Sequence, residues 1–217
     1  MTDRAATVSA IEASGVVAVI RLKDPASLRA VVDALAEGGV RALEVTMTVP
    51  RAIELIAQIA PTLPPEVVLG AGTVLDAPTA RAAVAAGARY VVSPVFRPEV
   101  VSACHELGAA AMPGCFTPTE ILTAWEAGAD VVKVFPATAL GPGYFRDLRG
   151  PLPQLRLMPT GGVSIANAGD WIRAGAVAIG VGTALVDPAA VEAGRFDEIT
   201  RKAREFVAAV AAARSTR

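Results

Sequence analysis

The 217-residue sequence predicts an α/β protein with a (β/α)8 TIM-barrel fold and an extra N-terminal helix. Two observations support this prediction. A stretch of helical character ends in glycine and is followed, after a short polar step, by a β-branched run, and this pattern recurs at the spacing of one β-plus-α unit. Eight such units fit along the chain, which is the number that closes a barrel of parallel strands.

The recurring pattern is clearest in the stretches "LAEGGVRALEVTM" (35–47), "VAAGARYVVSP" (84–94), "EAGADVVKVFP" (126–136) and "RAGAVAIGVG" (173–182). Glycine is common just after a helix because it adopts a positive φ without steric cost. Runs such as "VVKV" lack regular polar alternation, which is typical of parallel strands buried on both faces. Each occurrence therefore predicts the end of one helix and the beginning of the next strand.

The remaining units complete the series. Strands are expected at Val16–Ile20, Ala42–Thr46, Val67–Leu69, Tyr90–Val92, Ala110–Met112, Val131–Val134, Arg156–Met158 and Val177–Gly180. Helices are expected at Arg4–Ser14, Ala26–Glu37, Pro50–Ile59, Ala77–Ala86, Thr119–Ala127, Ile165–Ala174 and Phe196–Ala213. An open, doubly wound sheet is the alternative, but its first strand usually leads into a glycine-rich turn, where this chain has "RLKDPAS". We expect residues 1–217 to form one barrel domain.

Composition excludes several functional classes. A formal net charge of −1 provides no basic surface for nucleic acid. The longest uncharged stretches, such as residues 174–186, fall short of the ~20 apolar residues that span a membrane, and no signal-peptide core is visible. We expect a cytoplasmic protein in which Cys104 and Cys115 stay reduced. His105 is the only histidine, which excludes a zinc site built on several histidines, so no metal or cofactor is predicted.

Two ionisable residues interrupt apolar strands: Lys133 in "VVKVFP" and Glu44 in "LEVT". Residues two apart on a strand share a face, so Glu44 and Thr46 point to the same side. Active sites of this fold lie at the C-terminal ends of the strands. If Glu44 and Lys133 both point inward, they meet in the mouth of the barrel.

A buried lysine has its pKa lowered by desolvation. Neutrality near pH 7 requires roughly 4–5 kcal/mol of destabilisation of the charged form. A neutral amine attacks carbonyl carbons to form Schiff bases, and a carboxyl group such as that of Glu44 can move the protons that this reaction requires. The alternative is an internal Lys133–Glu44 ion pair without chemistry, which the spacing alone favours.

Glycines follow the last two predicted strands, in "TGG" (160–162) and "GVGT" (180–183). Exposed backbone N–H groups in such loops bind anions, and the loops after strands 7 and 8 are the frequent phosphate site of this fold. Arg21, at the end of the first strand, can bind a carboxylate or a phosphate through its planar guanidinium. Tight turns and a salt bridge at the rim are the structural alternatives.

Seven motifs occur in order between Val16 and Val186: "LEVTMTVP", "GAGTV", "SPVF", "MPGCFTPTE", "VVKVFPA", "PTGGV" and "GVGTALV". Together they resemble the 2-dehydro-3-deoxy-phosphogluconate (KDPG) aldolase and 4-hydroxy-2-oxoglutarate (KHG) aldolase family. The resemblance implies a class I, metal-free aldolase, usually a homotrimer, that cleaves 2-dehydro-3-deoxy-6-phospho-D-gluconate to pyruvate and D-glyceraldehyde 3-phosphate.

The resemblance also implies roles for individual residues. Lys133 corresponds to the Schiff-base lysine and Glu44 to the general acid and base. Where some members carry an arginine four residues after the glutamate, this chain has Thr48, and Arg21 then takes the carboxylate or the phosphate. Substrate contacts are expected from Arg21, Thr73, Pro94, Phe135, Thr160, Gly161, Gly162, Gly182 and Thr183.

Several alternatives stay open from the sequence. The substrate could be the galactonate epimer or 4-hydroxy-2-oxoglutarate, and the chain could be an inert barrel that binds phosphorylated sugar acids. A metal-dependent aldolase is disfavoured by the single histidine. A thiamine-phosphate-synthase-like transferase would require an aspartate-rich Mg²⁺ site that the predicted strand ends do not contain.

Overall fold

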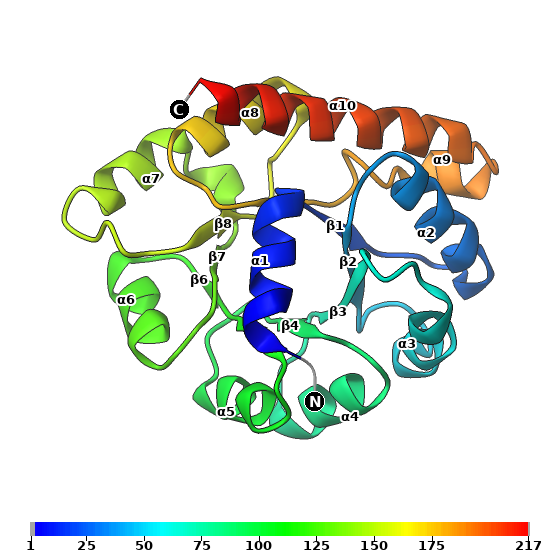
Figure 1. The fold of residues 1–217 in the computed structure, drawn as a ribbon, viewed down its shortest axis with the longest axis horizontal. Helices are drawn as coiled ribbons and strands as arrows, with labels where there is room; N and C mark the ends of the chain where they lie inside the picture. The colour runs from blue at the N-terminus through cyan, green and yellow to red at the C-terminus, as the bar shows by residue number, and fades with distance from the viewer. Residues whose placement is uncertain (1–2, 217) are drawn as a thin grey trace.

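A computed structural model describes residues 3–216 and shows parallel strands at the centre of a ring of helices (Figure 1). The strands are β1 (Val16–Ile20), β2 (Ala42–Thr46), β3 (Val68–Gly72), β4 (Tyr90–Val92), β5 (Ala110–Met112), β6 (Gly114–Cys115), β7 (Val132–Val134), β8 (Leu157–Pro159) and β9 (Ile179–Val181). The helices are α1 (Arg4–Ser14), α2 (Leu28–Glu37), α3 (Ala52–Ile59), α4 (Ala77–Ala85), α5 (Pro98–Glu106), α6 (Pro118–Glu126), α7 (Pro142–Arg149), α8 (Ile165–Arg173), α9 (Pro188–Glu192) and α10 (Phe196–Ser215). Short 3-10 turns occur at Pro25–Ser27, Ala60–Thr62 and Ala137–Ala139.

The strands pair in parallel and form a curled sheet. Six of them have the order β5-β4-β3-β2-β1-β9, and three have the order β6-β7-β8. Only Pro113 separates β5 from β6 along the chain, so one segment borders both groups. An isolated parallel bridge between Thr160 and Gly180 joins the end of β8 to β9. The C-terminal ends of all these strands therefore gather at one end of the sheet.

Alternate residues of the strands face two different environments. One set, which includes Leu43 and Val45, packs against the surrounding helices. The other set forms an inner cluster, consisting of Val8, Ile11, Val17, Ala42, Val68, Tyr90, Val92, Ala110, Met112, Val131, Met158 and Ala178. This period-two division is what buried parallel strands require, and it defines an interior that the strands share.

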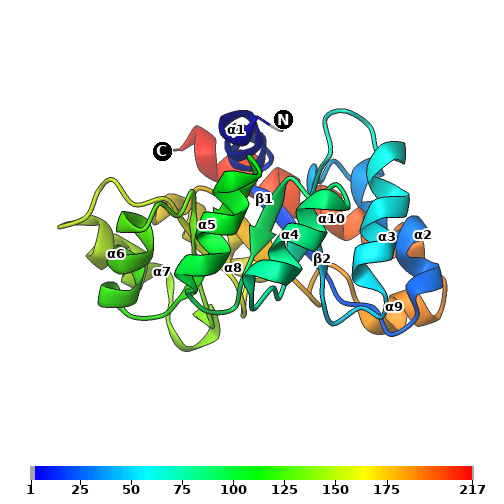
Figure 2. The same ribbon diagram turned by 90° about the horizontal axis from the view of Figure 1, so that it is seen from below.

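Helix α1 lies across the end of the strands opposite the loops that follow them (Figures 1 and 2). Its Val8 and Ile11 join the inner cluster together with Ala42 and Val68, the first residues of β2 and β3. Gly15, with φ = 66°, ends the helix and lets the chain turn directly into β1. The N-terminal helix therefore closes the interior at the N-terminal ends of the strands.

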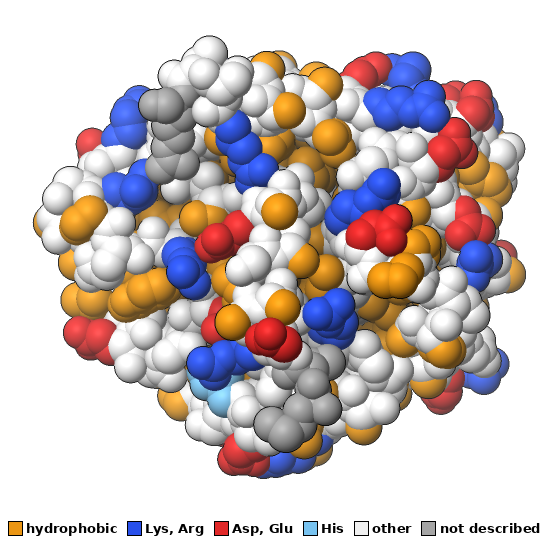
Figure 3. Space-filling model, in the orientation of Figure 1, with side chains coloured by type: hydrophobic (Ala, Val, Ile, Leu, Met, Phe, Trp, Pro, Cys, Tyr) orange, Lys and Arg blue, Asp and Glu red, His pale blue; other side chains and the backbone are white. Residues whose placement is uncertain are grey.

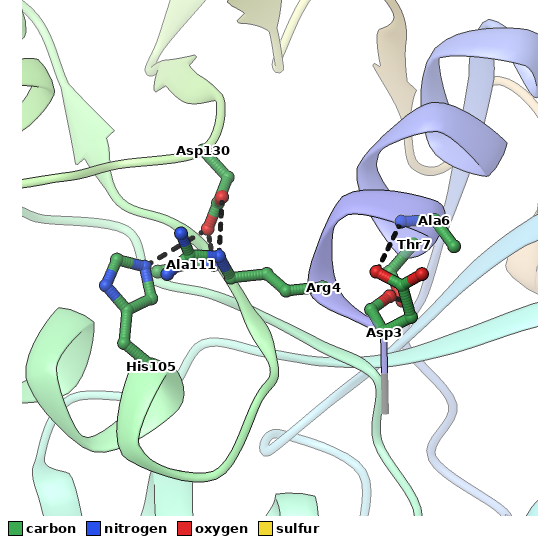
Figure 4. Close-up of polar contacts among 7 residues, drawn as sticks. All are labelled: Asp3, Arg4, Ala6, Thr7, His105, Ala111 and Asp130. Carbon is green, nitrogen blue, oxygen red and sulfur yellow. Dashed lines mark hydrogen bonds and ion pairs between the residues drawn. The ribbon is translucent and has the colours of Figure 1, made fainter. Parts of the chain in front are cut away.

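Polar contacts attach α1 to the strands (Figure 4). Arg4 Nε lies 3.4 Å from Asp130 Oδ1, in the loop before β7. Asp130 Oδ2 accepts a hydrogen bond from the backbone N–H of Ala111 at 2.9 Å and lies 3.2 Å from His105 Nε2. On this face of the molecule, charged side chains of both signs are interspersed with apolar ones (Figure 3).

The predicted elements agree with the structure to within a few residues. Glycines that follow helices in the recurring pattern have positive φ, as expected: Gly39, Gly87, Gly128 and Gly175. Gly108, after α5, also has positive φ. The structure adds the helices α5, α7 and α9 and the short strand β6, and β3 continues through Gly72 because each of its residues pairs with β2. Within residues 3–216, no helix combines the length and apolar character needed to cross a membrane.

Candidate active site

Lys133 and Glu44 both point into the interior. Lys133, on β7, lies two residues after Val131, and Glu44, on β2, lies two residues after Ala42. Both Val131 and Ala42 belong to the inner cluster. Their side chains are almost completely buried, with 2% of Lys133 and 1% of Glu44 exposed. The inward orientation that the sequence left conditional is therefore present, and the two groups come from separate parts of the sheet.

The amine of Lys133 has an environment that favours its neutral form. Burial lowers its pKa below the ordinary lysine value, the charge of Glu44 acts in the opposite direction, and the charge of Arg21 lowers it further. Nζ makes no hydrogen bond or ion pair with any residue between 3 and 216, and it lies 4.7 Å from the centroid of the Phe135 ring. An uncharged amine beside an aromatic face is suited to nucleophilic attack on a carbonyl carbon.

Glu44 has the complementary environment. Burial raises the pKa of its carboxyl group, while the charges of Lys133 and Arg21 oppose that rise. Neither carboxyl oxygen has a hydrogen-bond partner among the described residues, and no ion pair joins Glu44 to Lys133. An unsatisfied buried polar group costs about 1–3 kcal/mol, so the unpaired carboxyl group of Glu44 lowers the stability of the folded protein. Such groups are concentrated at functional sites, which favours the catalytic interpretation over a structural ion pair.

A cavity of about 320 Å³, which we call the glycine-loop cavity, lies beside Phe135, between the ends of β8, β9 and β1. Seven of the nine substrate-binding residues predicted from the sequence line it: Arg21, Phe135, Thr160, Gly161, Gly162, Gly182 and Thr183. Gly161 and Gly162 have φ values of 94° and 71°, which turn the backbone after β8. Because Phe135 also contacts the Lys133 amine, the cavity adjoins the reactive group.

Backbone N–H groups are available in this cavity. Those of Gly161, Gly162 and Thr183 find no acceptor within residues 3–216. The side chain of Asn167, in α8, holds the loop by donating to the Gly162 carbonyl at 2.9 Å and accepting from the Ser164 N–H at 2.9 Å. Free amides fixed at the start of a helix form a site suited to a phosphate or carboxylate.

Arg21 follows β1 and lies between two cavities. It lines the glycine-loop cavity and also a larger one of about 530 Å³, which extends towards Thr48 and α9. The larger cavity does not contact the glycine loops or Phe135. Of these two cavities, the smaller one therefore adjoins the amine and offers the free N–H groups.

Thr73 and Pro94 do not line the glycine-loop cavity. They follow β3 and β4, on the other side of the strand ends. Thr73 has φ = 60°, an uncommon conformation for a residue with a branched side chain. Such local strain often accompanies function, so the position of Thr73 is compatible with a substrate contact from the opposite side.

The structure brings two residues to the site that sequence reasoning missed. Ser164, the N-cap of α8, lines the glycine-loop cavity. Tyr90, on β4, belongs to the inner cluster, and its hydroxyl is buried without a partner. The "SIAN" stretch at the helix start was a usable signal for Ser164, whereas Tyr90 resembles any tyrosine in a strand.

Comparisons with known proteins find similar sequences along most of the chain. The profile of a family described as KDPG and KHG aldolase matches residues 8–202. The chain is 38% identical over 192 residues to the 2-dehydro-3-deoxy-phosphogluconate aldolase of Treponema pallidum (strain Nichols), covering 88% of this chain and 91% of the relative. It is also 38% identical over 176 residues to a probable 2-dehydro-3-deoxy-6-phosphogalactonate aldolase of Rhizobium meliloti (strain 1021), covering 79% and 82%.

A solved structure adds chemical detail about a similar protein. The KDPG aldolase of Legionella pneumophila, crystallised with pyruvate captured at low pH as a covalent carbinolamine intermediate, has a TM-score of 0.84 and 29% identity to this chain. The match covers 91% of this chain and 96% of that one.

Proposed function

The chain belongs to the KDPG and KHG aldolase family, and on this premise we propose that it cleaves 2-dehydro-3-deoxy-6-phospho-D-gluconate to pyruvate and D-glyceraldehyde 3-phosphate. Membership makes it an aldolase, and therefore a lyase. The observation that carries the proposal is the buried Lys133 amine, whose environment lowers its pKa, in the same interior as the Glu44 carboxyl group.

In the proposed mechanism, the neutral Nζ of Lys133 attacks the C2 ketone of the substrate. Glu44 supplies and removes the protons that convert the carbinolamine to an imine with loss of water. The protonated imine accepts the electron pair of the C3–C4 bond as a proton leaves the C4 hydroxyl, and the aldehyde departs. The remaining enamine is protonated at C3, and water releases pyruvate and the free amine.

The two anionic ends of the substrate have separate candidate sites. The free N–H groups of Gly161, Gly162 and Thr183 support phosphate binding in the glycine-loop cavity. We propose that Arg21 binds the carboxylate, because its charge acts on both Glu44 and Lys133 and C1 is bonded to the carbon that Lys133 attacks. Phosphate binding away from the reacting carbon supplies energy that orients the ketone.

The remaining substrate contacts are proposed around these two ends. Phe135 and Thr160 line the same cavity as the glycine loops, and we propose that they contact the carbon chain, with Gly182 beside Arg21. Thr73 and Pro94 would contact the pyruvyl part from the β3 and β4 side.

Further features of the proposed enzyme concern its fold closure, its assembly and its compartment. The Thr160–Gly180 bridge and the continuity of β5 and β6 support closure of residues 1–217 into a single eight-stranded barrel. Leu75, Val95 and Phe116 are exposed apolar side chains on loops that follow strands, which supports association of copies into a homotrimer. Two buried free thiols support a reducing compartment, the cytoplasm.

Borohydride trapping with pyruvate, followed by peptide mass mapping, tests the proposal. The chain has only three lysines, and the other two are engaged by carboxylates, Lys23 by Glu192 and Lys202 by Asp187. We expect a reduced pyruvyl adduct on the Lys133 peptide, present in Lys202→Met and absent from Lys133→Met. An adduct on another lysine, or none at all, would overturn the mechanism.

Two further measurements separate the alternatives. A barrel that only binds phosphorylated sugar acids would retain ligand but form no adduct. A metal-dependent aldolase would lose activity in EDTA, whereas we expect activity to persist. The kcat/KM values for the gluconate, its galactonate epimer and 4-hydroxy-2-oxoglutarate then establish the preferred substrate.

A further inference from the structure

Tyr90 is a buried polar residue that the proposed mechanism does not use. It is fully buried in the inner cluster, and its hydroxyl has no hydrogen-bond partner among residues 3–216. The chain has one other tyrosine, Tyr144, whose hydroxyl donates to the Phe116 carbonyl at 2.7 Å on the outside of the molecule. A phenylalanine would fill the same apolar space, so a buried hydroxyl at residue 90 calls for an explanation.

The strand register brings Tyr90 level with Glu44. Gly70 of β3 pairs with Glu44 of β2 on one side and with Tyr90 of β4 on the other. A Cβ at Gly70 would lie 2.4–2.5 Å from Cε1, Cε2 and Cζ of Tyr90, so the end of the ring that carries the hydroxyl lies over Gly70. The side chain thus extends from its own strand over β3, the strand that separates it from Glu44.

Glu44 approaches from the other side of β3. A Cβ at Gly72 would lie 1.9 Å from Glu44 Oε1, so the carboxyl group lies over Gly72. Gly70 and Gly72 are two residues apart on the same face of β3, a separation of about 7 Å along the strand. The phenol and the carboxyl group therefore occupy neighbouring positions above a surface that only glycines leave open.

Other groups also act on Glu44 or lie beside it on β2. The charged groups that act on it are Lys133, from β7, and Arg21, at the end of β1. The Thr46 hydroxyl, on its own strand, donates to the Ile20 carbonyl at 3.1 Å. Burial and the charge of Glu44 both raise the pKa of Tyr90, which keeps the phenol protonated and able to donate.

We propose that Tyr90 is a positioning residue, whose hydroxyl donates a hydrogen bond to the ionised carboxylate of Glu44 during the reaction. The two groups are not hydrogen-bonded in the structure, and catalytic hydrogen bonds often tighten only in the substrate complex. The inference rests on the proposed function, because it assigns Tyr90 to the proton transfers of Glu44. A donor to the ionised form stabilises that form and sets the pH range in which Glu44 acts as a base.

The test compares Tyr90→Phe with Tyr144→Phe, the same change at the chain's other tyrosine. Infrared difference spectra across a pH titration, recorded on protein saturated with pyruvate so that the site is occupied, report the Glu44 carboxyl band, assigned by its absence from Glu44→Gln. In Tyr90→Phe we expect its midpoint to rise by about one pH unit, the size of effect of one hydrogen bond to a charged group. We also expect kcat to fall about tenfold with little change in KM, and Tyr144→Phe to leave the midpoint and kcat unchanged.

The outcomes separate this inference from the proposed function. An unchanged Glu44 midpoint in Tyr90→Phe would overturn the role of Tyr90, while loss of turnover in Glu44→Gln would leave the proposed function intact. Full turnover in Glu44→Gln would instead remove the proposed role of Glu44. Thermal unfolding provides the folding control: Tyr90→Phe keeps the ring over Gly70, so we expect it to be at least as stable as the parent.

Discussion

Gly72 provides the space that the Glu44 carboxyl group occupies. A Cβ at residue 72 would lie 1.9 Å from Oε1 and 2.6 Å from Cδ of Glu44, closer than atoms can approach. The two residues lie on neighbouring strands, β3 and β2, where Gly72 pairs with Thr46. The position of the proposed acid and base therefore depends on the absence of a side chain on the next strand.

Gly72→Ala should displace the carboxyl group of Glu44 while leaving the fold intact, because Gly72 has an ordinary strand conformation. A displacement of about 1 Å at a reacting group can reduce kcat about 100-fold. Steady-state cleavage assays, with circular dichroism to confirm folding, measure this. Gly141→Ala is the matched control, because nothing lies within 4 Å of the added Cβ. Normal kcat in Gly72→Ala would show that the position of Glu44 does not limit turnover.

Lys133→Met should abolish cleavage and increase stability. The variant replaces a buried amine that has no partner among residues 3–216 with an apolar side chain of similar length. We expect a gain of about 0.5–2 kcal/mol in the free energy of unfolding, measured by urea denaturation. Lys202→Met, which removes a surface ion pair with Asp187, should change stability by less than about 0.5 kcal/mol.

The stability gain of Lys133→Met should depend on pH. The pKa of Lys133 is lower in the folded protein than the ordinary 10.5, so the unfolded chain binds the proton more tightly. Above pH 10.5 the amine is neutral in both the folded and the unfolded state, and the difference in the free energy of unfolding between variant and parent is smallest. As the pH falls from there towards the folded pKa, the parent loses stability and the difference widens. A difference that is constant across this window would contradict the lowered pKa.

The rate of borohydride-trappable imine formation with pyruvate should rise with pH, because only the neutral Lys133 amine is nucleophilic. The charge of Glu44 raises the pKa of Lys133, so Glu44→Gln should move the midpoint of this rise to lower pH. The maximal rate should also fall, because proton transfer is lost. A midpoint that moves upward would mean that Glu44 does not act on the amine as a negative charge.

Thr183→Ala should separate phosphate binding from chemistry. The variant keeps the backbone N–H of residue 183 and removes only the side-chain hydroxyl, which we expect to donate a second hydrogen bond to the phosphate. KM for the phosphorylated substrate should therefore rise about tenfold, the loss of one hydrogen bond to a charged group, while trapping of pyruvate, which has no phosphate, is unchanged. Thr123→Ala is the control, because the Thr123 hydroxyl donates to the Thr119 carbonyl on the outer helix α6. An equal loss of pyruvate trapping in Thr183→Ala would mean that the loop contacts the reacting carbons.

The sequence was sufficient to select Lys133 and Glu44 as candidates because a charged residue in a buried strand is conspicuous without any knowledge of its neighbours. The strand ranges were predictable where β-branched residues fill them, as at Val16–Ile20. They were less accurate at β3, whose Gly70 and Gly72 have no strand preference of their own. These glycines are in a strand because they pair with β2, a long-range contact that local pattern does not encode.

The role inferred for Tyr90 lay beyond sequence reasoning for the same reason. Tyrosine is common in strands, and nothing next to residue 90 in the sequence distinguishes it. Its significance comes from Gly70, one strand away, and from Glu44, two strands away. Likewise, Arg21 was identified as an anion-binding candidate, but only the structure shows that it lies beside the glycine loops.

Helix α1 also has a consequence for the sequence of events in turnover. Because Val8 and Ile11 fill the N-terminal end of the interior, the space around the Lys133 amine is closed at that end. We therefore expect substrate and products to pass the opposite end, where the loops that follow the strands lie. In the proposed mechanism the three-carbon fragment stays bonded to the Lys133 nitrogen after the C3–C4 bond breaks, so the aldehyde must depart first and pyruvate second.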